Sequence, residues 1–245
     1  MDKSIALVTG ANKGIGKEIA RQLAAAGHTV YVGARDAGRG KEAVAEISGD
    51  ARLLVLDVTD AGSVAAAARQ VPALDILVNN AGISSGAPKP VTEEDPDTFR
   101  RLYETNVFGV VAVTNAFLPA LRRSAHPRIV NISSGTASLA ASTGEAEGII
   151  VFASRPSGAQ GAYRSSKTAL NELTVLYANA LADEGFKVNA LAPGARRTDL
   201  IPGARTSPRA GDPAEGAAGA VRLALLPDDG PSGQFVSWDG TTVPW

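Results

Sequence analysis

The amino-acid sequence predicts a doubly wound α/β fold, in which one mostly parallel seven-stranded sheet carries helices on both faces. Short apolar runs alternate with stretches of helical period along the chain. The first run is followed at once by a glycine-rich loop, Gly10–Gly16. No internal repeat or change in composition divides the 245 residues. We therefore expect one domain that spans residues 1–245.

Six apolar runs are continuous rather than alternating, which is typical of strands buried on both faces of a parallel sheet. A last short strand is expected near the end of the chain. The predicted strands are Ile5–Val8, Val30–Val32, Leu53–Leu56, Leu74–Val78, Ile129–Ile132, Val188–Leu191 and Gln234–Ser237.

Between these runs, apolar residues recur at helical spacing and predict helices that pack on the sheet. One face comprises Ile15, Ile19 and Leu23, and another comprises Leu170, Leu173, Leu176, Tyr177 and Leu181. Residues 135–162 and 199–213 lack this period, and the first of them contains the apolar patch Ile149–Phe152. Both segments follow predicted strand ends, where open α/β sheets bind ligands. We expect 199–213 to cover the substrate.

Composition excludes several classes of function. The net charge of −1 argues against a surface for nucleic acid or anionic membrane. The sequence contains no cysteine, and its two histidines are His28, at the start of a predicted strand, and His126, before Pro127. We therefore expect no metal site. The N-terminus does not resemble a signal peptide and no run approaches the ~20 apolar residues of a membrane span, so a cytoplasmic location is expected.

Tyr163 and Lys167 lie four residues apart on a predicted helix, which brings their Cβ atoms to roughly 5–6 Å. A lysine ammonium at that distance favours the phenolate form of a tyrosine, whose ordinary pKa is about 10. Such a phenol can exchange a proton with an alcohol or carbonyl oxygen. The same spacing is also common on solvated helix turns, so its meaning depends on the surrounding sequence.

The loop Gly10-Ala11-Asn12-Lys13-Gly14-Ile15-Gly16 joins the first strand to the first helix. Glycine allows a sharp turn and a close approach to a pyrophosphate, and the helix N-terminus supplies free N–H groups. The position after the first strand favours a dinucleotide loop in a Rossmann-type fold. The alternative is a tight turn that binds nothing.

The end of the second predicted strand, Gly33-Ala34-Arg35-Asp36, bears on the choice of dinucleotide. An acidic residue there binds the ribose 2′-OH of NAD. We place Ala34 at that position, with Arg35 directed at a 2′-phosphate and Lys13 as a second cation. NADP(H) is therefore the preferred cofactor and NAD(H) the alternative, unless both cations are merely solvated surface residues.

Several motifs occur together in one order: Thr9–Gly16 (TGANKGIG), Asn79–Gly82 (NNAG), Asn106, Ser133-Ser134 after Asn131-Ile132, Tyr163-x-x-x-Lys167, and Pro193-Gly194 with Thr198. With these motifs the chain resembles the short-chain dehydrogenase/reductase superfamily over its whole length. The glycine loop and the Ala34-Arg35-Asp36 strand end look most like NADPH-dependent carbonyl reductases of the compact, single-domain form.

The resemblance implies a role for each catalytic residue. Tyr163 would exchange the proton with the substrate oxygen, and Lys167 would lower the pKa of Tyr163 and hydrogen-bond the nicotinamide ribose. Ser134 would orient the carbonyl and stabilise charge that develops on its oxygen. Asn106 would hold a water that links Lys167 to solvent.

The resemblance also implies a set of cofactor-binding residues. Within it Asn80 and its neighbours would line the adenosine ribose, Asp57 the adenine edge, and Thr198 the nicotinamide amide. The set is Gly10, Asn12, Lys13, Gly14, Ile15, Gly16, Arg35, Asp57, Val58, Asn80, Ala81, Gly82, Tyr163, Lys167, Pro193, Gly194 and Thr198.

Two features depart from the family pattern. Ser134 and Tyr163 are unusually far apart, so residues 135–162 are expected to insert a loop or short helix beside the active-site mouth. An insertion there covers an association surface in related carbonyl reductases, which leaves both a monomer and a homo-oligomer open. Arg196 stands where a branched apolar residue is usual, and its side chain could point at substrate or at solvent.

We expect an NADPH-dependent reductase of a small aldehyde or ketone, with no nucleic-acid or membrane partner. One alternative is an NAD(P)-dependent alcohol dehydrogenase that works oxidatively. Another is a non-catalytic dinucleotide sensor, which should have lost the tyrosine, the lysine or the glycine loop. No sequence pattern identifies the substrate.

Overall fold

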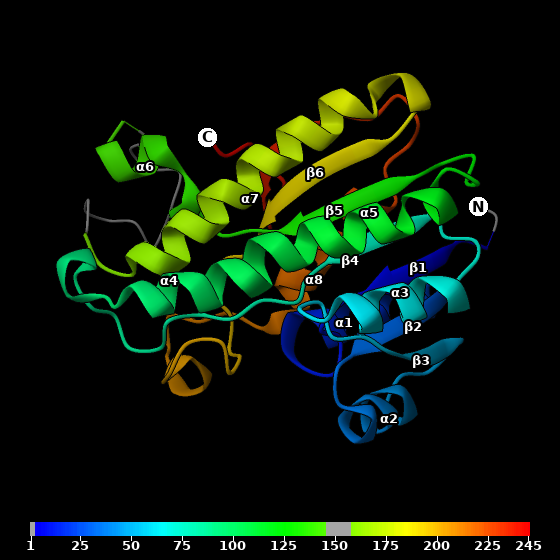
Figure 1. Ribbon diagram of the computed structural model, residues 1–245, viewed down its shortest axis with the longest axis horizontal. Helices are drawn as coiled ribbons and strands as arrows, with labels where there is room; N and C mark the ends of the chain where they lie inside the picture. Colours follow the sequence, from blue (N-terminus) through cyan, green and yellow to red (C-terminus); the bar gives the residue numbers. More distant parts are fainter. Residues whose placement is uncertain (1–2, 146–157) are drawn as a thin grey trace.

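A computed structural model describes residues 3–145 and 158–245. In that part of the chain seven strands form one sheet in the order β3-β2-β1-β4-β5-β6-β7 (Figure 1). Each neighbouring pair is parallel. The strands are β1 Ile5–Val8, β2 Thr29–Ala34, β3 Ala51–Val55, β4 Ile76–Asn79, β5 Arg128–Ile132, β6 Lys187–Ala192 and β7 Phe235–Ser237. The predicted doubly wound fold is confirmed.

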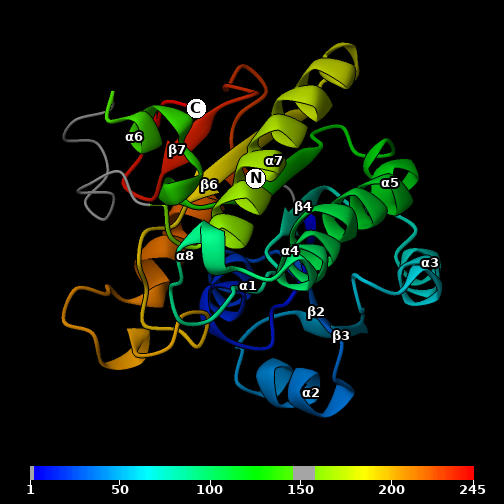
Figure 2. The ribbon, with the colours of Figure 1, turned by 60° about the vertical axis from the view of Figure 1, so that its left-hand side comes forward.

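Helices cover both faces of the sheet (Figure 2). Buried residues of α1, α2 and α8 form one hydrophobic cluster with the strands, and those of α3, α5 and α7 form the other. The helices are α1 Gly14–Ala25, α2 Ala37–Ala45, α3 Ala61–Gln70, α4 Pro96–Tyr103, α5 Gly109–Leu121, α6 Leu139–Thr143, α7 Gly161–Ala180 and α8 Pro213–Ala224.

The predicted face of α1 is confirmed, since Ile19 and Leu23 are fully buried and Ile15 packs against the same cluster. Each fully buried aliphatic side chain of this size contributes about 1.5–3 kcal/mol of transfer free energy. Burial of this face against the sheet therefore places the N-terminus of α1, and the glycine loop before it, at the carboxyl end of β1.

Two expectations about burial are wrong. In β3 the side chain of Leu54 is buried, but Val55 is 46% exposed, because β3 is an edge strand with a neighbour on one side only. On α7, Leu176 is 52% exposed, and the buried face instead includes Asn171 and Thr174.

These polar residues on α7 belong to a buried network beneath the carboxyl edge of the sheet. Asn79 Nδ2 donates to Thr114 Oγ1 at 3.1 Å and to Asn131 Oδ1 at 2.9 Å. Asn131 Nδ2 donates to Thr174 Oγ1 at 2.9 Å. The network joins β4 and β5 to α5 and α7, so it holds α7 in a defined position on the sheet.

The described parts of the two segments without a sequence period contain short helical turns. Residues 135–145 contain a 3₁₀ turn, Gly135–Ala137, and the short helix α6. Residues 146–157, with the predicted patch Ile149–Phe152, lie outside the described residues. The other segment contains a 3₁₀ turn, Ala204–Thr206.

The histidines do not form a metal site. His28 is buried and its Nδ1 accepts a hydrogen bond from the N–H of Ser4, whereas His126 is exposed beside Asp228. Within 3–145 and 158–245, no group of three His, Cys, Asp or Glu side chains could hold a metal ion. None of the helices described is long and apolar enough to span a membrane.

Thr174→Val should lower the free energy of unfolding by about 1–3 kcal/mol, because it leaves the buried Asn131 amide without its acceptor while nearly preserving side-chain shape. Urea unfolding measures the change. Asn179→Ala, on an exposed position of the same helix, is the control and should change the value little. Equal unfolding free energies for wild type and Thr174→Val would contradict a structural role for the network.

Candidate active site

Four groups of predicted site residues follow the carboxyl ends of four adjacent strands. The glycine loop follows β1, Asn80–Gly82 follow β4, Ser134 follows β5, and Pro193-Gly194 follow β6. The carboxyl ends of parallel strands meet at one edge, and the sheet order reverses between β1 and β4. This reversal creates the crevice in which open α/β sheets bind ligands.

Glycine is required in the loop by backbone conformation and by space. Gly10 and Gly14 have φ values of +62° and +58°, in the left-handed region that favours glycine. A Cβ on Gly16 would lie 2.3 Å from Asn80 Nδ2. That Asn80 amide donates to the carbonyl oxygens of Thr9 at 2.9 Å and Gly10 at 3.2 Å. Asn80 therefore supports the loop itself, a role that the sequence did not reveal.

The N-terminus of α1 is suited to bind an anion. Lys13 is its N-cap residue, and among the described residues no side chain caps it. Asp side chains cap four other helices, α2, α3, α4 and α8. The N–H groups of Gly14, Ile15 and Gly16 thus lie at a positive helix end, and the first turn of α1 contains no acidic residue. A dinucleotide pyrophosphate fits this site.

The predicted cations at the adenosine end differ in their surroundings. Lys13 Nζ lies 3.2 Å from a carboxylate oxygen of Asp199, so it is paired rather than directed at a phosphate. Arg35 is exposed at the end of β2. Asp36 caps α2 by accepting from the N–H of Arg39 at 3.0 Å, so this carboxylate is engaged at the helix start.

Asp57 and Val58 follow β3, beside Arg35. Hydrogen bonds from the backbone and side chain of Thr59, together with the charge of Arg35, hold the pKa of Asp57 below its usual range. Val58 packs against the start of α5, where a Cβ on Gly109 would lie 2.9 Å from it. Of the remaining predicted residues, Asn12 is half-buried in the glycine loop and Ala81 donates its N–H to Thr9 Oγ1 at 2.9 Å.

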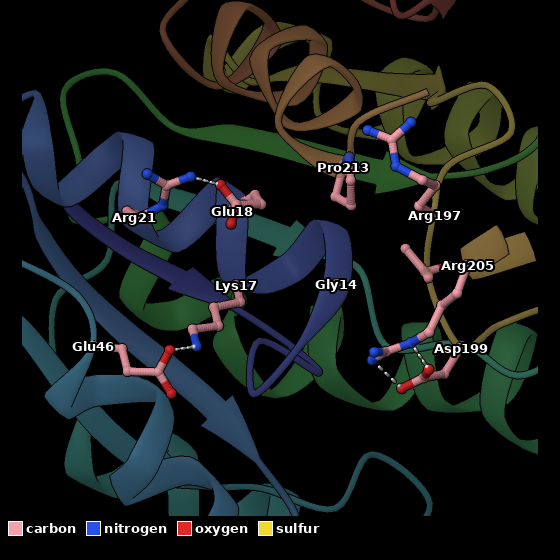
Figure 3. A pocket seen from close by; sticks show the side chains of 10 residues that line it. Gly14, Lys17, Glu18, Arg21, Glu46, Arg197, Asp199, Arg205 and Pro213 are labelled. Carbon is pink, nitrogen blue, oxygen red and sulfur yellow. Dashed lines mark hydrogen bonds and ion pairs between the residues drawn. The ribbon is translucent and has the colours of Figure 1, made fainter. Parts of the chain in front are cut away.

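A pocket of about 420 Å³ opens beside the glycine loop (Figure 3). Gly14 and Thr198, both predicted cofactor residues, form part of its wall. Four basic side chains from α1 and from the loop after β6 surround it, and Figure 3 shows three of them paired with carboxylates. The pairs are Lys17 with Glu46, Arg21 with Glu18, and Arg205 with Asp199, and the fourth base is Arg197.

Tyr163 and Lys167 are buried on the first turns of α7, at 6% and 5% exposure. Lys167 Nζ donates to the carbonyl oxygen of Ile132, at the end of β5, at 2.8 Å. Burial lowers the pKa of Lys167 to about 8. Burial also raises the pKa of Tyr163, which a hydrogen bond with Ser134 partly offsets. The pKa of Tyr163 is thus raised, whereas the sequence predicts that Lys167 lowers it.

Asn106 lies in a π-helical turn, Glu104–Phe108, between α4 and α5. Its side chain accepts from the N–H of Ile83 at 2.9 Å and donates to Ser166 Oγ at 3.0 Å. A Cβ on Gly82 would lie 3.3 Å from Asn106 Oδ1 and 3.4 Å from Lys167 Nζ. Asn106 and Lys167 therefore meet around Gly82, and the structure brings the four predicted catalytic residues together.

The side chain of Arg196 is not directed at solvent. Its side chain is 4% exposed and packs beneath the Pro193-Gly194 turn, with its Nε donating to the Pro193 carbonyl oxygen at 2.6 Å. Two residues later, Thr198 contacts the glycine loop, because a Cβ on Gly14 would lie 3.3 Å from the Thr198 methyl group. The loop after β6 thus includes the Pro193-Gly194 turn and also approaches the glycine loop through Thr198.

Sequence reasoning missed two residues that position α7. Ser133 Oγ donates to Asn171 Oδ1 at 2.6 Å. Glu94 Oε2 accepts from the N–H of Ala162 at 2.7 Å, at a helix start where Gln160 has a left-handed φ of 60° and makes no side-chain cap. A polar residue after a buried strand signals Ser133, but no local pattern signals Glu94, which lies far from α7 in sequence.

This arrangement of a glycine loop, an uncapped helix N-terminus and a tyrosine–lysine–serine cluster defines a dinucleotide-dependent oxidoreductase. The family model for short chain dehydrogenase matches residues 4–208. The chain belongs to the short-chain dehydrogenase/reductase family, and it is an enzyme that acts on a carbonyl/alcohol pair of a small molecule.

Proteins of known activity are similar to this chain over nearly its whole length. Salutaridine reductase from Papaver bracteatum is 34% identical, with 94% of this chain and 93% of the relative covered. (+)-Neomenthol dehydrogenase from Arabidopsis thaliana is 35% identical, with 95% of both covered. The NADPH-bound carbonyl reductase from chicken fatty liver is 29% identical, has a TM-score of 0.84, and covers 100% of both chains.

The lowered pKa of Lys167 predicts a pH-dependent stability. An unfolded lysine keeps its proton up to about 10.5, whereas the folded one loses it above about 8, so the unfolded state binds more protons in this window and stability rises with pH. Relative to Lys167→Met, the wild type should gain about 2 kcal/mol of unfolding free energy between pH 7 and 9.5. Urea unfolding at both pH values measures it, and a constant difference would contradict the lowered pKa.

Proposed function

We propose that this chain is an NADPH-dependent reductase that converts an aldehyde or ketone to an alcohol, with Tyr163 as the general acid. The observation that carries the proposal is the buried Tyr163 phenol, whose pKa Ser134 lowers against the effect of burial, at the same edge of the sheet as the uncapped N-terminus of α1. The alternative, an alcohol dehydrogenase that works oxidatively, uses the same residues in reverse and takes support from the name of the Arabidopsis relative.

When bound, NADPH supplies the hydride. Tyr163 Oη donates its proton to the substrate oxygen, and the Ser134 hydroxyl orients that oxygen and stabilises its developing charge. Burial raises the pKa of Tyr163 and so keeps it in the protonated form that a proton donor requires. Lys167 and Asn106, which meet around Gly82, lie where a proton can be returned to Tyr163 from solvent.

The preference for NADP(H) over NAD(H) rests on the end of β2. Ala34 supplies no carboxylate for a ribose 2′-OH, Asp36 is bound to α2, and the exposed Arg35 is available for a 2′-phosphate. Lys13 adds a cation only if a phosphate displaces Asp199. Similar solved structures include one with NADP, a gluconate 5-dehydrogenase, and one with NADH, a 3-ketoacyl-(acyl-carrier-protein) reductase.

We further propose that residues 199–213 cover the substrate, as the outer wall of the site. Asp199 contacts Lys13 of the glycine loop, and the carbonyl oxygen of Leu200 accepts from Ser84 Oγ at 2.5 Å. Leu200 is also a partly exposed apolar residue in this wall. The substrate would thus lie between this segment and the Tyr163 cluster.

Tyr163→Phe should abolish turnover, because it removes the proton donor, while leaving NADPH binding nearly intact. Carbonyl-dependent loss of NADPH absorbance measures turnover, and isothermal titration calorimetry measures binding. Tyr177→Phe removes a phenol from the same helix, which bonds Asn115 away from the site, and should retain activity. Turnover by Tyr163→Phe at the wild-type rate would remove Tyr163 from the mechanism.

Arg35→Ala should raise the Michaelis constant for NADPH roughly 10- to 100-fold, the cost of one charged contact to a phosphate, and change that for NADH little. Steady-state kinetics with each cofactor provide the comparison. Arg39→Ala, which removes an exposed arginine one turn along, is the matched control. An equal effect of Arg35→Ala on both cofactors would defeat the proposed preference.

A further inference from the structure

The side chain of Arg196 has unusual surroundings for an arginine. Its Nε donates to the Pro193 carbonyl oxygen at 2.6 Å and its Nη1 pairs with Glu215, in the first turn of α8. The guanidinium carbon lies 4.3 Å from the centre of the Trp238 ring, an attractive cation–π geometry. The side chain is 4% exposed, and its Nη2 is buried without a hydrogen-bond partner among the residues described.

Three glycines make room for this guanidinium. A Cβ on Gly211 would lie 2.1 Å from Nη1, one on Gly216 would lie 3.2 Å from Nε, and one on Gly194 would lie 3.2 Å from Nη2. Gly194 has a φ of +73°, so its backbone turns directly over Arg196. The guanidinium thus fills a space bounded by the backbone of these glycines and by the side chains of Trp238 and Glu215.

Backbone hydrogen bonds hold the main chain on either side of Arg196. The Gly211 N–H donates to the Ala195 carbonyl at 3.0 Å, the Arg197 N–H donates to the Gly211 carbonyl at 3.0 Å, and the Thr198 N–H donates to the Arg196 carbonyl at 2.8 Å. The same short segment includes Thr198, the predicted contact for the nicotinamide amide, together with Pro193 and Gly194 of the predicted cofactor set.

We propose that Arg196 is a positioning residue for the nicotinamide half of the dinucleotide: it fixes the Pro193-Gly194 turn to α8 and to Trp238. A branched apolar side chain could fill the space, but it could neither bond the Pro193 carbonyl nor pair with Glu215. Arg196 makes both of these contacts from beneath the turn, without touching the cofactor. The inference rests on the proposed function, because it assumes that a nicotinamide dinucleotide binds here.

Two ligands separate this role from a general structural one. NADPH occupies both halves of the site, whereas adenosine 2′,5′-bisphosphate carries the adenosine half with its 2′-phosphate and has no nicotinamide. Calorimetric titration of Arg196→Met should show a dissociation constant for NADPH raised about tenfold or more, the loss of one charged hydrogen bond. The dissociation constant for the bisphosphate should stay within about twofold of wild type.

Arg69→Met is the control, because Arg69 is an exposed arginine on α3, on the face of the sheet opposite α8. It should leave binding of NADPH unchanged. Equal weakening of both ligands by Arg196→Met, or no weakening of either, would overturn the role of Arg196. Failure of the wild type to bind NADPH and NADH would instead overturn the proposed function, and this inference with it.

If Arg196→Met does not fold, Glu215→Gln decides the question. The Glu215 carboxylate is 51% exposed, and its loss frees one side of the guanidinium without opening a cavity. We expect the same selectivity on a smaller scale, with NADPH about threefold weaker and the bisphosphate unchanged. Wild-type binding of both ligands by a folded Glu215→Gln would overturn the inference.

Discussion

The packing of α7 against β5 is polar, and the geometry of the site depends on it. Hydrogen bonds from β5 and the residue after it reach α7, among them Lys167 to the Ile132 carbonyl, Ser133 to Asn171, and Asn131 to Thr174. Apolar contacts alone would allow a helix to slide or rotate on a sheet, since they are not directional. Buried polar pairs do not, because each one costs the full desolvation of its partner when broken. The position of Tyr163 over the carboxyl end of β5 follows from this constraint.

The burial of Tyr163 and Lys167 also disfavours the charged forms of both side chains. Desolvation lowers the pKa of Lys167 and raises that of Tyr163, so both groups are driven toward their neutral forms. A neutral phenol suits a proton donor, and a lysine with a pKa of about 8 still carries its charge at neutral pH. The hydrogen bond with Ser134 has the opposite effect and lowers the pKa of Tyr163. Acid–base behaviour here is thus set by burial and hydrogen bonding together, rather than by the Tyr163–Lys167 spacing alone.

Local sequence predicted the fold because the strands of a parallel sheet are themselves continuous apolar runs, and it predicted the glycine loop because glycine adopts left-handed backbone conformations without steric cost. It failed where burial depends on distant neighbours. Nothing in the sequence around Val55 says that β3 is an edge strand, and nothing around Leu176 says that Asn171 and Thr174 take the buried face. The pairing of Lys13 with Asp199 and of Arg196 with Glu215 likewise joins residues that only the folded chain brings together.

The loop after β6 is held by contacts of very different strength. Its inner part, residues 193–198, is fixed by a buried guanidinium and by backbone hydrogen bonds. Its outer part is tied to the glycine loop through Lys13 and Asp199, and both side chains are substantially exposed. Exposed ion pairs contribute about 0–1 kcal/mol, whereas a hydrogen bond that involves a charged group, such as that of the Arg196 guanidinium with the Pro193 carbonyl, contributes about 1.5–3 kcal/mol. Separating residues 199–213 from the glycine loop therefore costs little, while the Pro193-Gly194 turn keeps its place.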